Sequence, residues 1–329
     1  MPSYHDAKPN AVPQRQWQTF TAAVAVSTST RDRLAQRIAG HRAKIGTRWR
    51  LLDTTTQATL VIAFLRTNLT YAELAAGHHI STPTCWRYID EGIGLLAQAA
   101  IRLKDVVRLV RKAGWDYLLV DGVNVPTVAF GRKLNRRQKH YSGKHKRHGV
   151  NVQTICAPDG RLLRASAALP GKTTDITAAR RHKLDVKVGR LIGLLADLGY
   201  LGLADVLTGY RRKRGEKQLP AAKRAANKVH ASLRCLGERG NAQLRWWRVL
   251  ATELRCRPAR CTRVVKAVLA CTTLRPHPSP PEHTPTTPAG LPDPTPTRIR
   301  PRATAAGWIL AVPTNATRSP DRDSTAITP

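Results

Sequence analysis

Apolar positions divide the chain into a helical part and a strand-like part. Between residues 17 and 115 they recur at spacings of three and four, as in LLDTTTQATLVIAFLRTN, which is the period of an amphipathic helix. Between residues 116 and 200 the apolar runs are short or alternating and end at Gly, Pro or Asp, which indicates strands. These runs are DYLLVDG, GVNVQTIC, RLLRASAA and LIGLLAD. The pattern predicts an all-α domain followed by an α/β domain.

Further helices are expected around and after the strands. We expect one at about 175–183, one long helix or two across the Ala-, Arg- and Leu-rich residues 219–254, and another at 258–271. The two ends of the chain differ from the rest. Residues 1–16 are polar with three prolines, and 13 of the 22 prolines fall from residue 272 onward. We therefore predict a loose N-terminus at 1–16, folded domains at 17–115 and 116–271, and a disordered Pro/Thr-rich tail at 272–329.

Residues 69–96 have the pattern of two short helices joined by a tight turn. Tyr71, Leu74 and Ala75 can form the inner stripe of the first helix, and Gly77 stands where a C-terminal cap is expected. The first of the two helices is therefore predicted to end just before the turn.

The second of these helices has its own start signal. Ser81 can cap it, and Pro83 is tolerated in its first turn. Its apolar face is formed by Trp86, Ile89 and Ile93. Such a pair of helices is either a DNA-reading helix-turn-helix or an ordinary helical corner. In the first interpretation, the residues near DNA are Thr82, Thr84 and Arg87.

The charge of the chain narrows the class of partner. Lys and Arg number 55 against 21 Asp and Glu, which gives a formal net charge of +34. Such a chain attracts polyanions, and neutralising phosphates releases counterions, so nucleic acid is the expected partner. A basic run between the strands favours a phosphate-contacting loop, with the cations Lys139, Lys144, Lys146 and Arg147.

Other patterns indicate where such a protein works. The chain has no run of about 18 apolar residues, which a membrane span needs. Its N-terminus lacks the apolar core of a signal peptide. The six cysteines form no CxxC pair, so we expect reduced thiols and no zinc site. These observations predict a cytoplasmic protein associated with the nucleoid.

Three acids stand out in so basic a chain. Asp121 ends the strand-like DYLLV, and Asp197 ends LIGLLA. Glu238 lies in the long helix, on one face with Arg234 and Arg245. If the three carboxylates converge, they could hold two Mg²⁺ or Mn²⁺ ions for in-line attack on a phosphodiester. The same acids also fit a turn, a helix cap and a surface ion pair, so their spacing alone leaves both interpretations open.

The motifs around these acids resemble those of DDE transposases of the insertion-sequence-five and harbinger-like group. The resembling segments are LLVDGVNVPT, HYSGKHKRHGVNVQ, LPGKTTDITAAR and LLADLGYLG, in that order along the chain. In the last motif of the family an Arg precedes the Glu by four residues and a basic residue follows it by seven, as Arg234 and Arg245 do here. The resemblance covers roughly residues 30–271, including the pair of helices typical of the group's helix-turn-helix.

The resemblance implies a ribonuclease-H-like core, in which a mixed sheet is flanked by helices, preceded by the helix-turn-helix domain. It implies metal-dependent cleavage of double-stranded DNA at terminal inverted repeats, followed by strand transfer. The catalytic and metal-binding residues would be Asp121, Asp197 and Glu238, with Asp175, Arg234 and Arg245 in support. It also implies a homodimer or larger assembly on paired DNA ends.

The sequence departs from the family pattern at several positions. Leu198 replaces the usual lysine after the second aspartate, Ala231 replaces a tyrosine, and Arg245 replaces a lysine. The tail from residue 272 does not resemble the family. A catalytically decayed or repurposed sequence-specific DNA-binding protein is therefore the alternative function, whereas the strand-end acids disfavour a basic RNA-binding protein.

Overall fold

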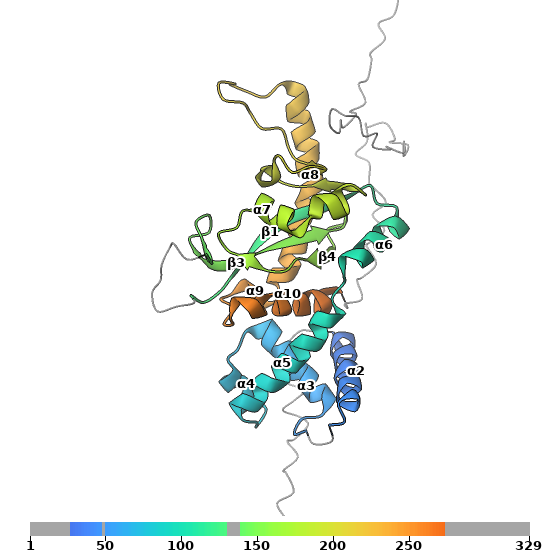
Figure 1. Cartoon of the computed structure of the whole chain (residues 1–329), viewed down its shortest axis with the longest axis vertical. Helices are drawn as coiled ribbons and strands as arrows, with labels where there is room; N and C mark the ends of the chain where they lie inside the picture. Colours follow the sequence, from blue (N-terminus) through green and yellow to red (C-terminus); the bar gives the residue numbers. More distant parts are fainter. Residues whose placement is uncertain (1–26, 48–49, 130–138, 274–329) are drawn as a thin grey trace, which may run out of the picture.

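The computed structural model describes residues 27–47, 50–129 and 139–273. The predicted loose N-terminus at 1–16 lies outside the described residues, as does the predicted tail from residue 274 onward. Figure 1 shows a layer of helices at one end of the molecule, a sheet with its own helices at the other, and α9 and α10 between them.

Helices α2 to α5 form the first layer. Their bounds are α2 (Thr28–Lys44), α3 (Thr54–Thr67), α4 (Tyr71–Gly77) and α5 (Thr82–Ala99). Helix α5 begins as the sequence predicts: the Ser81 hydroxyl accepts from the Thr84 N–H, and Pro83 stands in its first turn. Helix α3 is buried from Gln57 to Leu65, because α2, α5 and α9 all pack against it. Of the helices that the structure describes, none is both long and apolar enough to cross a lipid bilayer.

The turn between α4 and α5 differs from the prediction in two details. Helix α4 includes Gly77, and the left-handed position falls instead on His79, with φ 51°. Trp86 does not join the buried stripe of α5. The residue is 40% exposed, and the Arg260 guanidinium lies over its ring. The stripe consists of Cys85, Tyr88, Ile89, Gly92, Ile93 and Leu96.

The second layer is a mixed sheet in the order β2-β3-β1-β6-β7, with β4 and β5 also paired to β3. Its strands are β1 (Tyr117–Pro126), β2 (Tyr141–Ser142), β3 (Arg147–Cys156), β4 (Leu162–Ala165), β5 (Leu169–Pro170), β6 (Gly193–Leu195) and β7 (Val206–Leu207). Strand β1 pairs antiparallel with β3, without interruption from Leu119 opposite Cys156 to Pro126 opposite Gly149. Strands β6 and β7 run parallel to β1. The predicted mixed α/β architecture is confirmed.

Helices cover both faces of this sheet. They are α6 (Leu103–Ala113), α7 (Asp175–His182), α8 (Ala221–Arg245), α9 (Arg248–Ala251) and α10 (Pro258–Thr273), with a π-helical turn at Asp185–Gly189 and a 3₁₀ turn at Leu198–Tyr200. Because side chains alternate along a strand, Leu119 and Asp121 of β1 face α8, whereas Gly122 faces α7. Asp121 is also not at a strand end, as predicted from DYLLV, but in the middle of β1.

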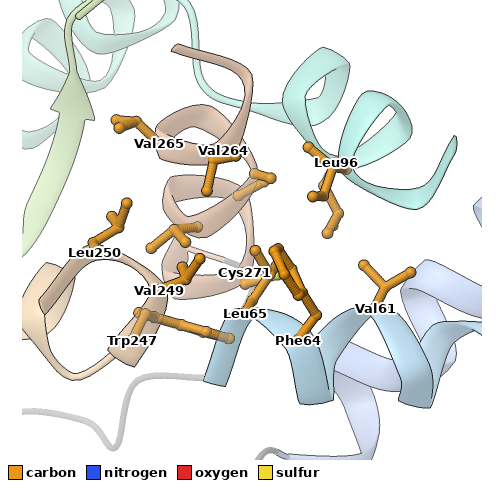
Figure 2. Packing of buried hydrophobic residues seen from close by; sticks show 14 of the residues in the cluster. Val61, Phe64, Leu65, Leu96, Trp247, Val249, Leu250, Val264, Val265 and Cys271 are labelled. Atoms are coloured by element: carbon orange, nitrogen blue, oxygen red, sulfur yellow. The ribbon is translucent and has the colours of Figure 1, made fainter. Parts of the chain in front are cut away.

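A single core cluster joins the two layers. It includes Phe64 and Leu65 of α3, Leu96 of α5 and the buried face of α10, and it extends to Leu119 and Val123 of the sheet. Figure 2 shows the side chains of α10 between those of α3, α5 and the segment around Trp247. The C-terminal helix is therefore the common packing partner of the helical layer and the sheet.

Candidate active site

Asp121 is the centre of the candidate site. Its backbone is paired with β3, opposite Thr154, and the pairing of β1 with β6 ends at Leu119, two residues before it. One carboxylate oxygen, Oδ1, accepts the N–H of Gly122 at 2.8 Å. The other, Oδ2, accepts the side-chain amide of Asn241 from α8 at 2.6 Å. Asn241 also accepts the Thr154 hydroxyl at 2.9 Å, so the amide is oriented from both sides.

The electrostatic surroundings of Asp121 disfavour its charged form. Burial is the largest cause that raises the pKa of Asp121, and the nearby carboxylates of Asp197 and Asp175 raise it further. The N–H of Gly122 and the Arg234 guanidinium act in the opposite direction but do not compensate. The structure therefore holds aspartates close enough together to repel one another.

Asp197 follows the end of β6, the parallel neighbour of β1. It caps the 3₁₀ turn that follows, because its Oδ1 accepts the N–H of Gly199 at 2.9 Å. In the described structure its other oxygen takes part in no hydrogen bond, and the side chain is partly exposed. Asp197 can therefore offer an oxygen beside Asp121 to a cation that enters from solvent.

A buried polar network fixes Asp175 at the start of α7. Asn151 donates to Asp175 Oδ1 at 2.8 Å, and Gln153 donates to Asn151 Oδ1 at 2.8 Å. The hydroxyl of Tyr200 donates to Gln153 Oε1 at 2.6 Å. Burial, and then the neighbouring aspartates, raise the pKa of Tyr200 well above its usual value, so the hydroxyl keeps its proton and remains a donor. The chain of bonds links the turn after Asp197 to α7 through β3.

Asp175 lies on the opposite face of β1 from Asp121. A Cβ atom on Gly122 would lie 1.9 Å from Asp175 Oδ1, so the carboxylate occupies the place that a side chain would need. The Lys144 ammonium lies 3.7 Å from Asp175 Oδ2, so the basic loop reaches Asp175 as well. Asp175 therefore packs against the strand that carries Asp121, on the face opposite Asp121.

Glu238 is exposed on α8 and is not joined to the aspartates. In the described part of the chain it makes no hydrogen bond or ion pair, including with Arg234. Its neighbours along the helix do reach the site, because Asn241 bonds to Asp121 and Arg234 lies within its electrostatic range. Among the described residues no set of three His, Cys, Asp or Glu side chains is arranged to hold a metal ion.

The predicted DNA contacts fall in two separate places. Thr82 and Arg87 are exposed in the first turns of α5, at the far end of the molecule from the sheet, and Thr84 is partly buried. The basic loop is exposed and ends at β3, and its contact with an aspartate is the ion pair of Lys144 with Asp175. Its cations are Lys139, Lys144, Lys146 and Arg147. Arg245 is exposed and lies near His145 of this loop. Burial is the largest cause that lowers the pKa of His145, and the positive charge of Arg245 is among the causes that lower it further.

Sequence reasoning missed several residues of the site. Asn151 and Gln153 were not singled out, although two polar residues on one face of an apolar strand are a usable signal. The helical period places Asn241 on the face of Glu238, three residues later, but it does not predict the bond of Asn241 to Asp121. The projecting segment before α8 was also missed: Figure 1 shows it at the edge of the molecule, and it exposes Arg211, Arg212, Lys213, Arg214 and Lys217.

Residues 120–274 match the family of DDE superfamily endonucleases, and the mixed sheet flanked by helices is consistent with that family. The chain is also 33% identical over 197 residues to a protein of Streptomyces albus G named as the transposase for insertion sequence element IS112. The match covers 59% of this chain and 70% of the relative. This chain therefore belongs to the DDE-type transposases, the enzymes of mobile elements. No solved structure matches it.

Proposed function

We propose that this transposase cuts double-stranded DNA at the terminal inverted repeats of its element and transfers the freed ends into target DNA. Asp121, Asp197 and Glu238 would bind two divalent metal ions, Mg²⁺ or Mn²⁺. The observation that carries this proposal is the pair of aspartates, Asp121 and Asp197, held within electrostatic range in a partly buried place.

The residues present fit a hard divalent cation. Carboxylate oxygens are the ligands that Mg²⁺ and Mn²⁺ prefer. Repulsion between neighbouring carboxylates opposes folding, and a cation between Asp121 and Asp197 would turn this repulsion into attraction. Among the described residues Glu238 makes no hydrogen bond or ion pair, so no such bond opposes a turn of its side chain along α8 toward Asp121.

The neighbouring residues would have distinct tasks. When bound, the metal ions activate the attacking water or 3′-hydroxyl and stabilise the leaving oxygen. Asn241 orients Asp121 through its amide, and Asp175 holds β1 from the opposite face. Arg234 and Arg245 would neutralise the phosphates that flank the cleaved bond.

Recognition of DNA is proposed for two surfaces. Helices α4 and α5 would act as the helix-turn-helix, with Thr82, Thr84 and Arg87 at base edges or phosphates. The basic loop with Lys139, Lys144, Lys146 and Arg147 would hold the backbone beside the aspartates. The exposed positions of Arg87 and of all four loop cations support this proposal.

Several finer assignments are also proposals. The motifs favour the insertion-sequence-five and harbinger-like group, and the antiparallel β1–β3 pair beside parallel β6 supports a ribonuclease-H-like core. We further propose a domain division at 17–115 and 116–271, a homodimer or larger assembly on paired DNA ends, and a cytoplasmic location at the nucleoid.

A specific observation favours the second candidate, a decayed or repurposed DNA-binding protein. Leu198 is 49% exposed directly after Asp197, where the family has a lysine. The cation that would face DNA beside the metal site is therefore replaced by an exposed apolar side chain. Such a protein would keep its affinity for DNA but would not cleave it.

The test is cleavage of supercoiled plasmid that carries the inverted repeats flanking the gene, with Mg²⁺ or Mn²⁺ added. Asp121→Asn should abolish cleavage, and Asp116→Asn, an exposed aspartate just before the same strand, should retain it. Divalent metal should raise the Tm of the wild-type chain and of Asp116→Asn, but not that of Asp121→Asn. Unchanged cleavage by Asp121→Asn refutes the catalytic assignment. DNA binding without cleavage by the wild-type chain favours the second candidate.

A further inference from the structure

A basic cavity lies where the helical layer meets the sheet. Its volume is about 740 Å³, and it is lined by the end of α5, the start of α6, strand β4 and one face of α10. Its charged residues come from three separate segments and are all cations: Arg102, Arg164, Arg263 and Lys266. No Asp or Glu is among the residues that line it. The lining therefore attracts anions.

Arg164 is the most informative of these cations. It stands on β4, where its guanidinium is partly buried, and loss of water is the one cause that lowers its pKa. Within the described residues no carboxylate pairs with it. A cation that loses hydration without gaining a partner costs folding energy. An anionic ligand in the cavity would compensate that cost.

The other cations are compensated to different degrees. Arg263 lies 3.4 Å from Asp90 Oδ1 and also donates to the Asp90 carbonyl, so part of its charge is neutralised outside the cavity. Lys266 forms no ion pair in the described structure, and Arg102 is exposed at the mouth. Among the described residues, the side chains of Arg164, Lys266 and Arg102 therefore present positive charge outside any ion pair, although Asp105 accepts the backbone N–H of Arg102.

We propose that this cavity binds phosphate groups, and that its ligand is the sugar-phosphate backbone of duplex DNA that lies across the opening of the cavity. This extends the proposed function, because it needs DNA to be the partner. The cavity is larger than one phosphate. Besides the polar Gln98 and Thr262, its remaining wall is apolar and suits the carbon surface of a deoxyribose. The larger apolar residues are Ile101, Leu103 and Leu269. A free polyphosphate has the same chemistry and is distinguished by the test.

The test compares two variants of the full chain that lose the same charge. Arg164→Gln/Lys266→Gln removes cations from the cavity, and Lys104→Gln/Lys112→Gln removes exposed cations of α6 outside it. Binding of a fluorescent duplex is measured by anisotropy over a range of salt concentrations. The cavity variant should lower the slope of log K against log salt by about 1.8, about 0.9 for each lost phosphate contact. The α6 variant should leave it unchanged. Thermal unfolding checks that both variants fold.

A second arm uses inorganic tripolyphosphate as the probe. If the cavity variant keeps the wild-type salt slope for DNA but loses the rise in Tm caused by tripolyphosphate, the site binds free polyphosphate. Equal slopes for both variants, with no loss of the tripolyphosphate effect, overturn the proposal. The two experiments also separate this proposal from the catalytic assignment. If only the catalytic assignment is wrong, Asp121→Asn still cleaves DNA, and the cavity variant still has a lower salt slope than the wild-type chain.

Discussion

Gly240 is the point of closest approach between α8 and the sheet. A Cβ atom at this position would lie 2.1 Å from the Sγ atom of Cys156, far inside contact distance. Cys156 is 2% exposed in β3, so its side chain has little room to turn away. Gly240→Ala must therefore push α8 off the sheet. Asn241 is the next residue, so its bond to Asp121 should weaken at the same time.

The magnitude follows from opposing effects. Overpacking of a well-filled interior costs about 1–3 kcal/mol. Replacing a glycine inside a helix by alanine returns about 1 kcal/mol, and the weakened bond from Asn241 to a carboxylate costs about 1.5 kcal/mol. We expect a net loss of about 2 kcal/mol, which for a chain of this size lowers the Tm by about 4–8 °C.

The decisive assay is a double-mutant cycle with Cys156→Ala. Without Sγ, the new Cβ lies 3.4 Å from the Cβ of residue 156, which is tolerable. In the Cys156→Ala background, Gly240→Ala should therefore be neutral or stabilising by up to about 1 kcal/mol. Thermal unfolding of the four proteins measures the coupling, and metal-dependent cleavage should fall with Gly240→Ala and recover in the double variant. An equal loss of stability in both backgrounds would show that the two residues do not collide.

Other predictions concern single positions. Gly122→Ala should cost about 1–3 kcal/mol, because its Cβ would meet Asp175 Oδ1; an unchanged Tm contradicts this packing. The raised pKa of Asp121 means that the folded state binds more protons than the unfolded state between pH 3.8 and that raised pKa, so its carboxylate opposes folding at higher pH. Asp121→Asn should thus raise the Tm in metal-free buffer at neutral pH, and a lower Tm for the variant would contradict the repulsion at Asp121. The rise in the wild-type Tm caused by metal should shrink as the pH falls through the raised pKa of Asp121. Ser81→Ala should cost about 1 kcal/mol by removing the cap of α5, whereas Ser81→Asp should not; equal Tm values would refute the cap.

Local patterns predicted most of the elements. The short apolar runs correspond to β1, β3, β4 and β6, and the Ala- and Arg-rich stretch is α8 followed by α9. These predictions hold because burial of one face imposes a period of two on a strand and 3.6 on a helix. Start signals such as Ser81 are equally local, because a cap bonds to residues within its own first turn.

Contacts between distant segments were not predictable in the same way. Trp86 lies under the guanidinium of Arg260 and not in the buried stripe of α5. Arg260 comes 174 positions later in the chain, so no pattern within α5 predicts this contact. Gly122 and Gly240 look like ordinary glycines until Asp175 and Cys156 are seen against them. The location of Asn241 at Asp121 likewise depends on how α8 crosses the sheet, which no local period encodes.

The location of α10 has a consequence for how such a gene decays. This helix ends at Thr273, yet its buried face completes the interior of helices that begin near the start of the described chain. A stop codon or frameshift ahead of Pro258 would thus leave α3 and α5 with an open apolar flank, even though their own codons are intact.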